Sequence, residues 1–157
     1  MTNLPVLIEP NIELRKQSHS VAISDIESEQ VQTLIDDLIE TMGVENGVGI
    51  AAPQVGVQKR IIIVDVDDEP IALINPKITS RSLRKINFEE GCLSVPGIYG
   101  IVRRHKIIKV KALDRHGNQL AFRAVGLLSV VLQHETDHLD GILFIDRTDH
   151  FINRQRL

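Results

Sequence analysis

The chain has 157 residues, 43% of them hydrophobic and 25% charged, which suits one domain over residues 1–157 with a sizeable core. The net charge of -3 gives no attraction to nucleic acid or an anionic membrane, and 3% aromatic residues argue against base stacking. The single cysteine, Cys92, excludes an intrachain disulfide and suits a reducing compartment. The N-terminus lacks a signal-peptide pattern and no stretch approaches a membrane span, so we expect a cytoplasmic protein.

Helices are predicted towards both ends of the chain. Residues 24–43 have a helical apolar period, with Ser24 and Asp25 as candidate N-caps and Gly43 at the end. The expected buried stripe of this helix comprises Ile26, Val31, Leu34, Ile35, Leu38, Ile39 and Met42. Residues 126–141 predict a second helix, whose nearly all-apolar first half indicates deep burial.

Strands dominate the middle of the chain. Four segments have strand patterns: residues 60–66, 71–78, 106–114 and 120–125. A turn at Asp67, Asp68 and Glu69 joins the first two, residues 45–57 are expected to form an irregular loop, and residues 88–100 are punctuated by glycine and proline. This order predicts an α+β fold: mixed or antiparallel strands around a buried, central C-terminal helix, with one N-terminal helix.

The second predicted helix carries His-Glu-x-x-His at residues 134–138. His134 and His138 are one helical turn apart on the same face, so their imidazoles can hold one divalent metal, with Glu135 beside it to handle protons. The alternative is a surface helix whose histidines are merely polar. The apolar run before His134 favours the metal site, because buried imidazoles need partners.

A catalytic metal of this type needs a third protein ligand and one open position. Two ordinary metallopeptidase arrangements lose that ligand, because the position for a third histidine holds Phe144 and no glutamate follows Glu135. His150 is the only later histidine and lies in a short polar tail. Cys92 is the other candidate, although a lone cysteine can equally be an inert buried residue. A Cys–His–His set would admit iron as well as zinc.

Three blocks of sequence carry a resemblance to one family. These are "GVGIAAPQ" at residues 47–54, "EGCLS" at 90–94 and "QHETDHLDG" at 133–141. Together, in this order and spacing, they resemble the motifs of peptide deformylases. The opening "VLIEPNIELRKQ" also resembles the N-terminus of that family, so the likeness covers nearly the whole chain.

The resemblance implies a metal held by Cys92, His134 and His138, with water in the fourth position. Fe(II) is the implied native metal, and nickel, cobalt or zinc could occupy the same site. The implied activity is hydrolysis of the formyl group from N-formylmethionyl nascent peptides, with release of formate.

The resemblance also assigns roles around the metal. Glu135 is the implied general base, while the Gln54 side-chain amide and the Leu93 backbone N–H would stabilise the oxyanion. Without the resemblance, Gln54 would be a loop cap and Leu93 a core residue.

Further residues are implied to bind substrate. Gly47 and Gly49 would let the backbone pair closely with an extended peptide. Glu90, two residues before Cys92, would orient its loop, and Gly91 beside it is also expected to bind substrate. Outside that context, Glu90 would be a solvated carboxylate. The pocket for the methionine side chain would be lined by residues that could equally be plain core residues: Val48, Phe88, Leu127, Val130 and Val131.

The chain departs from the family pattern in two places. Tyr99 stands where many members carry an arginine, while Arg104 matches a commonly basic position whose role in binding the substrate backbone stays open. Long members continue into a C-terminal helix that docks on the ribosome, whereas this sequence ends at "FINRQRL", as in a short-tailed bacteriophage or divergent bacterial form or a truncated chain. Ribosome docking is therefore in doubt, and a monomer is expected.

A basic run in the second half of the chain could suggest an RNA surface. Because alternate residues of a strand face solvent, we interpret it as a solvated face. Its members are Arg103, Arg104, His105, Lys106, Lys109 and Lys111.

Two other functions compete with deformylation. One is a general metallopeptidase of the His-Glu-x-x-His type, which lacks its downstream ligand here. The other is a non-catalytic module with a structural metal, which would need a fourth protein ligand such as His105 or His116.

Overall fold

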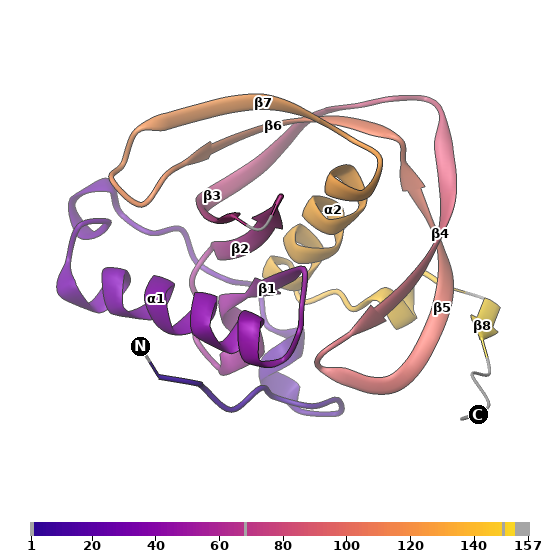
Figure 1. Cartoon of the computed structure of the whole chain (residues 1–157), viewed down its shortest axis with the longest axis horizontal. Helices are drawn as coiled ribbons and strands as arrows, with labels where there is room; N and C mark the ends of the chain where they lie inside the picture. Colours follow the sequence, from indigo (N-terminus) through magenta and orange to yellow (C-terminus); the bar gives the residue numbers. More distant parts are fainter. Residues whose placement is uncertain (1, 68, 149, 153–157) are drawn as a thin grey trace.

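The computed structural model describes residues 2–67, 69–148 and 150–152. In this part of the chain two α-helices, α1 (Glu29–Val44) and α2 (Leu127–Leu139), accompany two antiparallel sheets (Figure 1). The predicted α+β class is confirmed, and so is the central position of the C-terminal helix. Four short 3-10 turns complete the described helical elements: η1 (Ile12–Arg15), η2 (Ile23–Asp25), η3 (Ala52–Val55) and η4 (Phe144–Asp146).

The sheets of the described residues differ in size. The larger has five strands, in spatial order β1 (Gly49–Ala51), β2 (Ile61–Val66), β3 (Glu69–Arg81), β6 (Ile107–Leu113) and β7 (Gln119–Val125). The smaller has three, in order β4 (Lys85–Cys92), β5 (Val95–His105) and β8 (His150–Ile152). All neighbouring strands pair antiparallel, and β1 and β4 each lie at an edge of their sheet.

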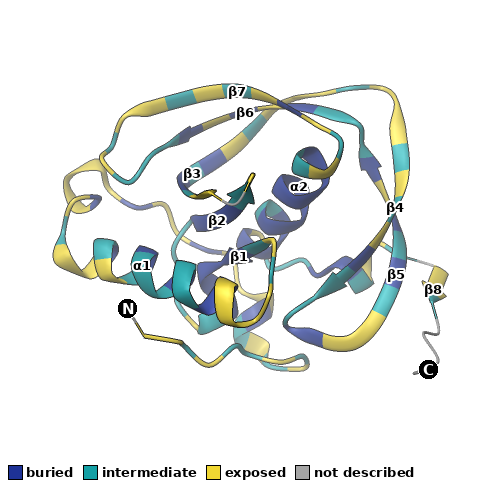
Figure 2. Ribbon diagram, viewed as in Figure 1, coloured by how far each residue is buried: buried dark blue, intermediate teal, exposed yellow. Residues whose placement is uncertain are grey.

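Strand β2 is buried on both faces, which explains its unbroken β-branched run. Because side chains alternate along a strand, Ile61 and Ile63 join one hydrophobic cluster with α1, while Ile62 and Val64 join another with α2. Helix α2 contacts β1, β2 and β7 of the larger sheet and β5 of the smaller one. Figure 2 shows most of α2 as buried, in agreement with its apolar sequence.

The start of the first helix was predicted too early. Helix α1 begins at Glu29, where the Ser28 side chain accepts a hydrogen bond from the backbone N–H of Val31. Ser24 does not cap it, because its hydroxyl bonds to the Asp25 carboxylate inside η2. The extended backbone of Ser28 separates that turn from the helix.

The two glycine-rich segments contain more regular structure than predicted. The expected loop at residues 45–57 includes β1 and η3, since Gly49–Ala51 pairs with Ile62–Val64 of β2. The punctuated segment at residues 88–100 lies within the β4–β5 hairpin. Both strands are formed by pairing with the next strand in the chain, β2 for β1 and β5 for β4, rather than by an alternating pattern of their own.

The chain makes a tight turn directly after α2. Gly141 has φ +72°, and a Cβ atom there would lie 2.4 Å from the backbone oxygen of Arg15. Gly141 therefore follows the helix end in a conformation that glycine adopts without strain, and Phe144, which stands where a third histidine ligand would be, is 1% exposed and belongs to the core.

Two predictions fall partly outside the described residues. Asp68 of the predicted turn is not described, although Asp67 beside it has φ +54°. In the tail "FINRQRL", residues 153–157 are likewise outside the described part. Neither described helix has the length and apolar character needed to cross a membrane.

We predict that Gly141→Ala lowers the free energy of unfolding by about 2–3 kcal/mol, because the added methyl group meets backbone at a positive φ. Gly43→Ala is the matched control: Gly43 is an exposed residue in the last turn of α1, where an added Cβ has nothing within 4 Å, and the change should stabilise by up to about 0.5–1 kcal/mol. Urea unfolding measures both. Equal effects of the two substitutions would contradict this account of the turn.

Candidate metal centre and active site

Three potential metal ligands converge from two different elements. Cys92 is the last residue of β4, whereas His134 and His138 lie one turn apart on α2. Their ligand atoms all lie within 4.8 Å of one another. The Nε2 atom of His138 is 3.2 Å from the Cys92 Sγ atom and 3.2 Å from Nε2 of His134. The structure thus brings together the ligand set that the sequence suggested.

The chemistry of these donors fits a divalent cation. The Nδ1 atom of His134 lies 2.8 Å from the Glu90 carboxylate, which fixes the proton on Nδ1 and leaves the Nε2 lone pair facing the other ligands. Burial alone would raise the pKa of Glu90, but hydrogen bonds from Arg104 and His134 hold it at about 2, so the carboxylate is charged. One sulfur and two imidazole nitrogens suit zinc or iron.

Glu135 is buried beside these ligands without a full set of partners. Its Oε2 atom has no hydrogen-bond partner among the described residues. Burial raises the pKa of Glu135 to about 7. The other oxygen, Oε1, passes so close to Gly49 that a Cβ atom there would lie 2.6 Å from it. The arrangement can therefore accept and return a proton, and glycine at position 49 makes room for it.

A cavity of about 490 Å³ opens onto this group. Except for His138, which is 1% exposed, every site residue predicted from the sequence lines it. These residues are Gly47, Val48, Gly49, Gln54, Phe88, Glu90, Gly91, Cys92, Leu93, Leu127, Val130, Val131, His134 and Glu135. Val130 and Val131 are buried, whereas Val48 and Leu127 are about half exposed, which places these two at its rim.

Gln54 is held in a fixed orientation beside Cys92. Its Oε1 atom accepts a hydrogen bond from the Ala51 backbone at 2.9 Å, so its Nε2 atom must be the donor side. That Nε2 lies 3.2 Å from the Ser94 hydroxyl and 3.5 Å from the Cys92 sulfur. The amide can thus donate towards a group bound next to the sulfur.

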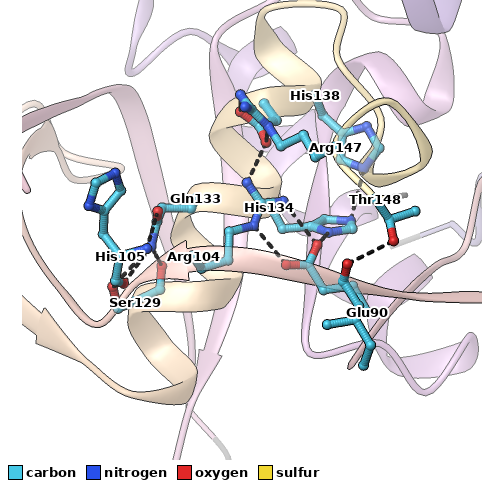
Figure 3. Close-up of polar contacts among 11 residues, drawn as sticks. Glu90, Arg104, His105, Ser129, Gln133, His134, His138, Arg147 and Thr148 are labelled. Atoms are coloured by element: carbon cyan, nitrogen blue, oxygen red, sulfur yellow. Dashed lines mark hydrogen bonds and ion pairs between the residues drawn. The ribbon is translucent and has the colours of Figure 1, made fainter. Parts of the chain in front are cut away.

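A buried ionic network behind the ligands was missed by sequence reasoning (Figure 3). Arg104 donates to both Glu90 oxygens, at 2.7 and 2.9 Å, and to Asp137 at 2.6 Å. Arg104 is 3% exposed, so its assignment to a solvated face is wrong, and Glu90 is not a solvated carboxylate. Strand alternation would have indicated this, because Gly100, Val102 and Arg104 share the buried face of β5.

A second polar cluster fixes the middle of α2 (Figure 3). The Gln133 side chain accepts from the His105 backbone N–H at 3.1 Å and donates to the His105 carbonyl at 2.9 Å. The Ser129 hydroxyl donates to the same carbonyl at 2.9 Å. The His105 ring lies 2.7 Å from the Ser82 carbonyl. Among the described residues, neither His105 nor His116 joins the ligand group, so the fourth ligand required for a structural metal is not supplied.

Comparisons with known proteins decide the family. The family model for polypeptide deformylases matches residues 3–154. A peptide deformylase from Xylella fastidiosa strain M12 is 48% identical over 149 residues, covering 93% of this chain and 87% of that protein. This chain belongs to the polypeptide deformylase family.

Solved structures agree with that assignment. A class I type b peptide deformylase from Acinetobacter baumannii superposes with a TM-score of 0.91 at 38% identity, covering 94% of this chain and 100% of that one. A structure of that enzyme type from the same organism with Met-Ala-Ser bound gives a TM-score of 0.88 at 36% identity, covering 92% and 97%. The family predicted from the three motifs is confirmed.

We predict that Arg104→Met destabilises the protein by about 3–5 kcal/mol, because Glu90 and Asp137 would lose a buried cationic partner. The control is Arg103→Met on the same strand, where the side chain is exposed and the change should stay within about 0.5 kcal/mol. Denaturant unfolding of the metal-free proteins measures both. A loss below about 1 kcal/mol for Arg104→Met would contradict the role given to the network.

Proposed function

We propose that the protein is a metal-dependent deformylase that removes the formyl group from N-formylmethionyl nascent peptides and releases formate. The observation that carries this proposal is the convergence of Cys92, His134 and His138 beside Glu135 at one cavity. The Acinetobacter baumannii enzyme with Met-Ala-Ser bound supports the substrate class, since Met-Ala-Ser is what remains when its N-formyl form loses the formyl group.

The residues that would hold the metal are Cys92, His134 and His138. We propose Fe(II) as the native metal, with zinc, nickel or cobalt able to take its place; a set of one sulfur and two imidazole nitrogens is compatible with iron as well as with zinc. When bound, such an ion lowers the pKa of a coordinated water and polarises a carbonyl group.

Glu135 would move the proton in the reaction. Its carboxylate takes a proton from the attacking water as the new C–O bond forms at the formyl carbon. When the C–N bond breaks, Glu135 returns the proton to the departing amine, so the products are formate and a free N-terminus. Glu135 lines the cavity, and its Oε2 atom has no hydrogen-bond partner in the described part of the chain, which supports this role.

Gln54 and Leu93 would stabilise the negative oxygen that develops on the formyl group. The Gln54 amide already presents its N–H side next to Cys92, and Leu93 follows Cys92 in the chain and lines the cavity. Donors placed in advance towards a developing charge act without reorganisation, which is why each typically contributes about 100- to 1,000-fold in rate.

An extended peptide would bind between the edge strands. Both β1 and β4 lie at sheet edges, and Gly47, Gly49, Glu90 and Gly91 line the cavity on these two sides. Their backbone groups could pair with a substrate in extended form. The methionine side chain would enter the apolar part, lined by Val48, Phe88, Leu127, Val130 and Val131.

The setting of the reaction is also part of the proposal. We propose a monomeric, cytoplasmic enzyme whose single catalytic domain spans residues 1–157, with the bacterial origin of its relatives as support for the location. The substrates would be nascent chains, and ribosome docking is not part of the proposal.

We predict that Glu135→Gln lowers formate release from a formyl-Met peptide by about 100- to 10,000-fold while one metal stays bound, because the amide cannot take the proton. Formate is assayed under anaerobic conditions, and metal content is measured on the same samples. Glu27→Gln, an exposed position before α1, is the control and should keep full activity.

The wild-type protein provides the wider test. Release of formate without cleavage of internal peptide bonds is expected. Metal-loaded protein that cuts internal bonds and releases no formate would overturn the proposal in favour of a general metallopeptidase.

A further inference from the structure

Arg147 lies beyond α2, at the end of η4, and reaches back to the helix. Its Nε and Nη2 atoms donate to the two oxygens of Asp137 at 2.5 and 2.6 Å. The Asp137 side chain is only 12% exposed, whereas that of Arg147 is 42% exposed. A surface residue thus holds both oxygens of a nearly buried carboxylate, a geometry that fixes the carboxylate's orientation.

Asp137 links Arg147 to the ligand His134 through three further contacts. Asp137 accepts from Arg104 at 2.6 Å, Arg104 grips both oxygens of Glu90, and Glu90 accepts from the His134 ring at 2.8 Å. Along this path the charges alternate: Arg147, Asp137, Arg104, Glu90. Figure 3 shows Arg147 and Glu90 on opposite sides of Arg104 and His134.

We propose that Arg147 is a positioning residue for the Cys92–His134–His138 centre, acting through Asp137 and Arg104 without touching metal or substrate. This inference rests on the metal centre of the proposed function. Asp137 sits on α2 with both histidines, while Glu90 sits on β4 with Cys92. Arg104 therefore connects the two elements that supply the ligands, β4 through Glu90 and α2 through Asp137. Arg147 fixes the Asp137 carboxylate in this connection.

Loss of Arg147 removes two charged hydrogen bonds from Asp137. The carboxylate is then free to turn towards water, and Arg104 loses a firmly placed partner on the helix side. Cys92 and the two histidines lie on separate elements. If the contact between Arg104 and Asp137 weakens, these ligands therefore sample a wider range of relative positions. Binding must then restrict them, which weakens affinity for the metal.

The test is a comparison of Co(II) affinity in purified proteins, by competition with a chelator. We expect Arg147→Ala to weaken binding about tenfold, at the lower end of the range for residues outside the ligand set. Arg147→Lys keeps the charge but loses the bidentate fork, so its affinity should fall between wild type and Arg147→Ala. The visible Co(II) spectrum, which reports ligand geometry, should change in the same order.

Arg15→Ala is the matched control. Arg15 pairs with Asp146, the neighbour of Arg147, and so tethers the same segment without contacting Asp137. Its Co(II) affinity and spectrum should match wild type within about twofold, a small effect beside the tenfold change expected above.

Three outcomes would overturn the inference. Arg147→Ala could bind Co(II) within twofold of wild type, or Arg15→Ala could weaken binding equally, which would assign the effect to the segment rather than to Asp137. If Arg147→Ala does not fold, Arg147→Lys takes its place, and a Co(II) affinity equal to that of the wild type would also overturn the inference. If the wild-type protein itself bound no Co(II), the proposed function would fail, and this result is separate from the other three.

Discussion

The site depends on one contact above all, the bidentate ion pair between Arg104 and Glu90. The pair lies within the β4–β5 hairpin, whose first strand ends in Cys92. Two further contacts join it to α2, which carries the two histidines: Arg104 donates to Asp137, and Glu90 accepts from the His134 ring. Buried ion pairs often contribute little net stability compared with apolar packing, because both charges must leave water. Removing one partner is different, because the other charge is then left buried and unpaired, which is the cost predicted above for Arg104→Met. The ligand atoms of Cys92 on the hairpin and of the two histidines on α2 lie within 4.8 Å of one another, and the Arg104–Asp137 and Glu90–His134 contacts connect the same two elements.

Two glycines beside the cavity are closely packed against neighbouring side chains. Gly49 leaves space for the Glu135 carboxylate, and Gly91 leaves space for the Tyr99 ring, which would lie 2.7 Å from an added Cβ. Tyr99 thus packs beside the cavity, which it also lines. Gly49 and Gly91, one from each motif, thus leave room for neighbouring side chains.

Features that depend on one short segment could be predicted from the sequence, whereas features that depend on contacts between segments could not. The period of α2 and the spacing of His134 and His138 are properties of one short segment, so both were predicted correctly, and the resemblance supplied Cys92. The start of α1 was wrong because three polar residues, Ser24, Asp25 and Ser28, are all competent caps and only the backbone of Ser28 selects one. Strand β1 forms only by pairing with β2, and the partners of Arg104, Glu90 and Asp137, lie 14 and 33 residues away, so the local pattern does not specify these contacts. Arg104 was misplaced because a run of basic residues hid the alternation of β5.

The central claim is that Cys92 completes the metal site. X-ray absorption at the metal edge of the Zn(II)- or Fe(II)-loaded protein tests it most directly, because sulfur and nitrogen scatter differently and at different distances. For Zn(II), we predict one sulfur at about 2.3 Å and two imidazole nitrogens at about 2.0–2.1 Å, with the sulfur shell lost in Cys92→Ala. A first shell made only of nitrogen and oxygen in the active wild-type protein would contradict the site described above.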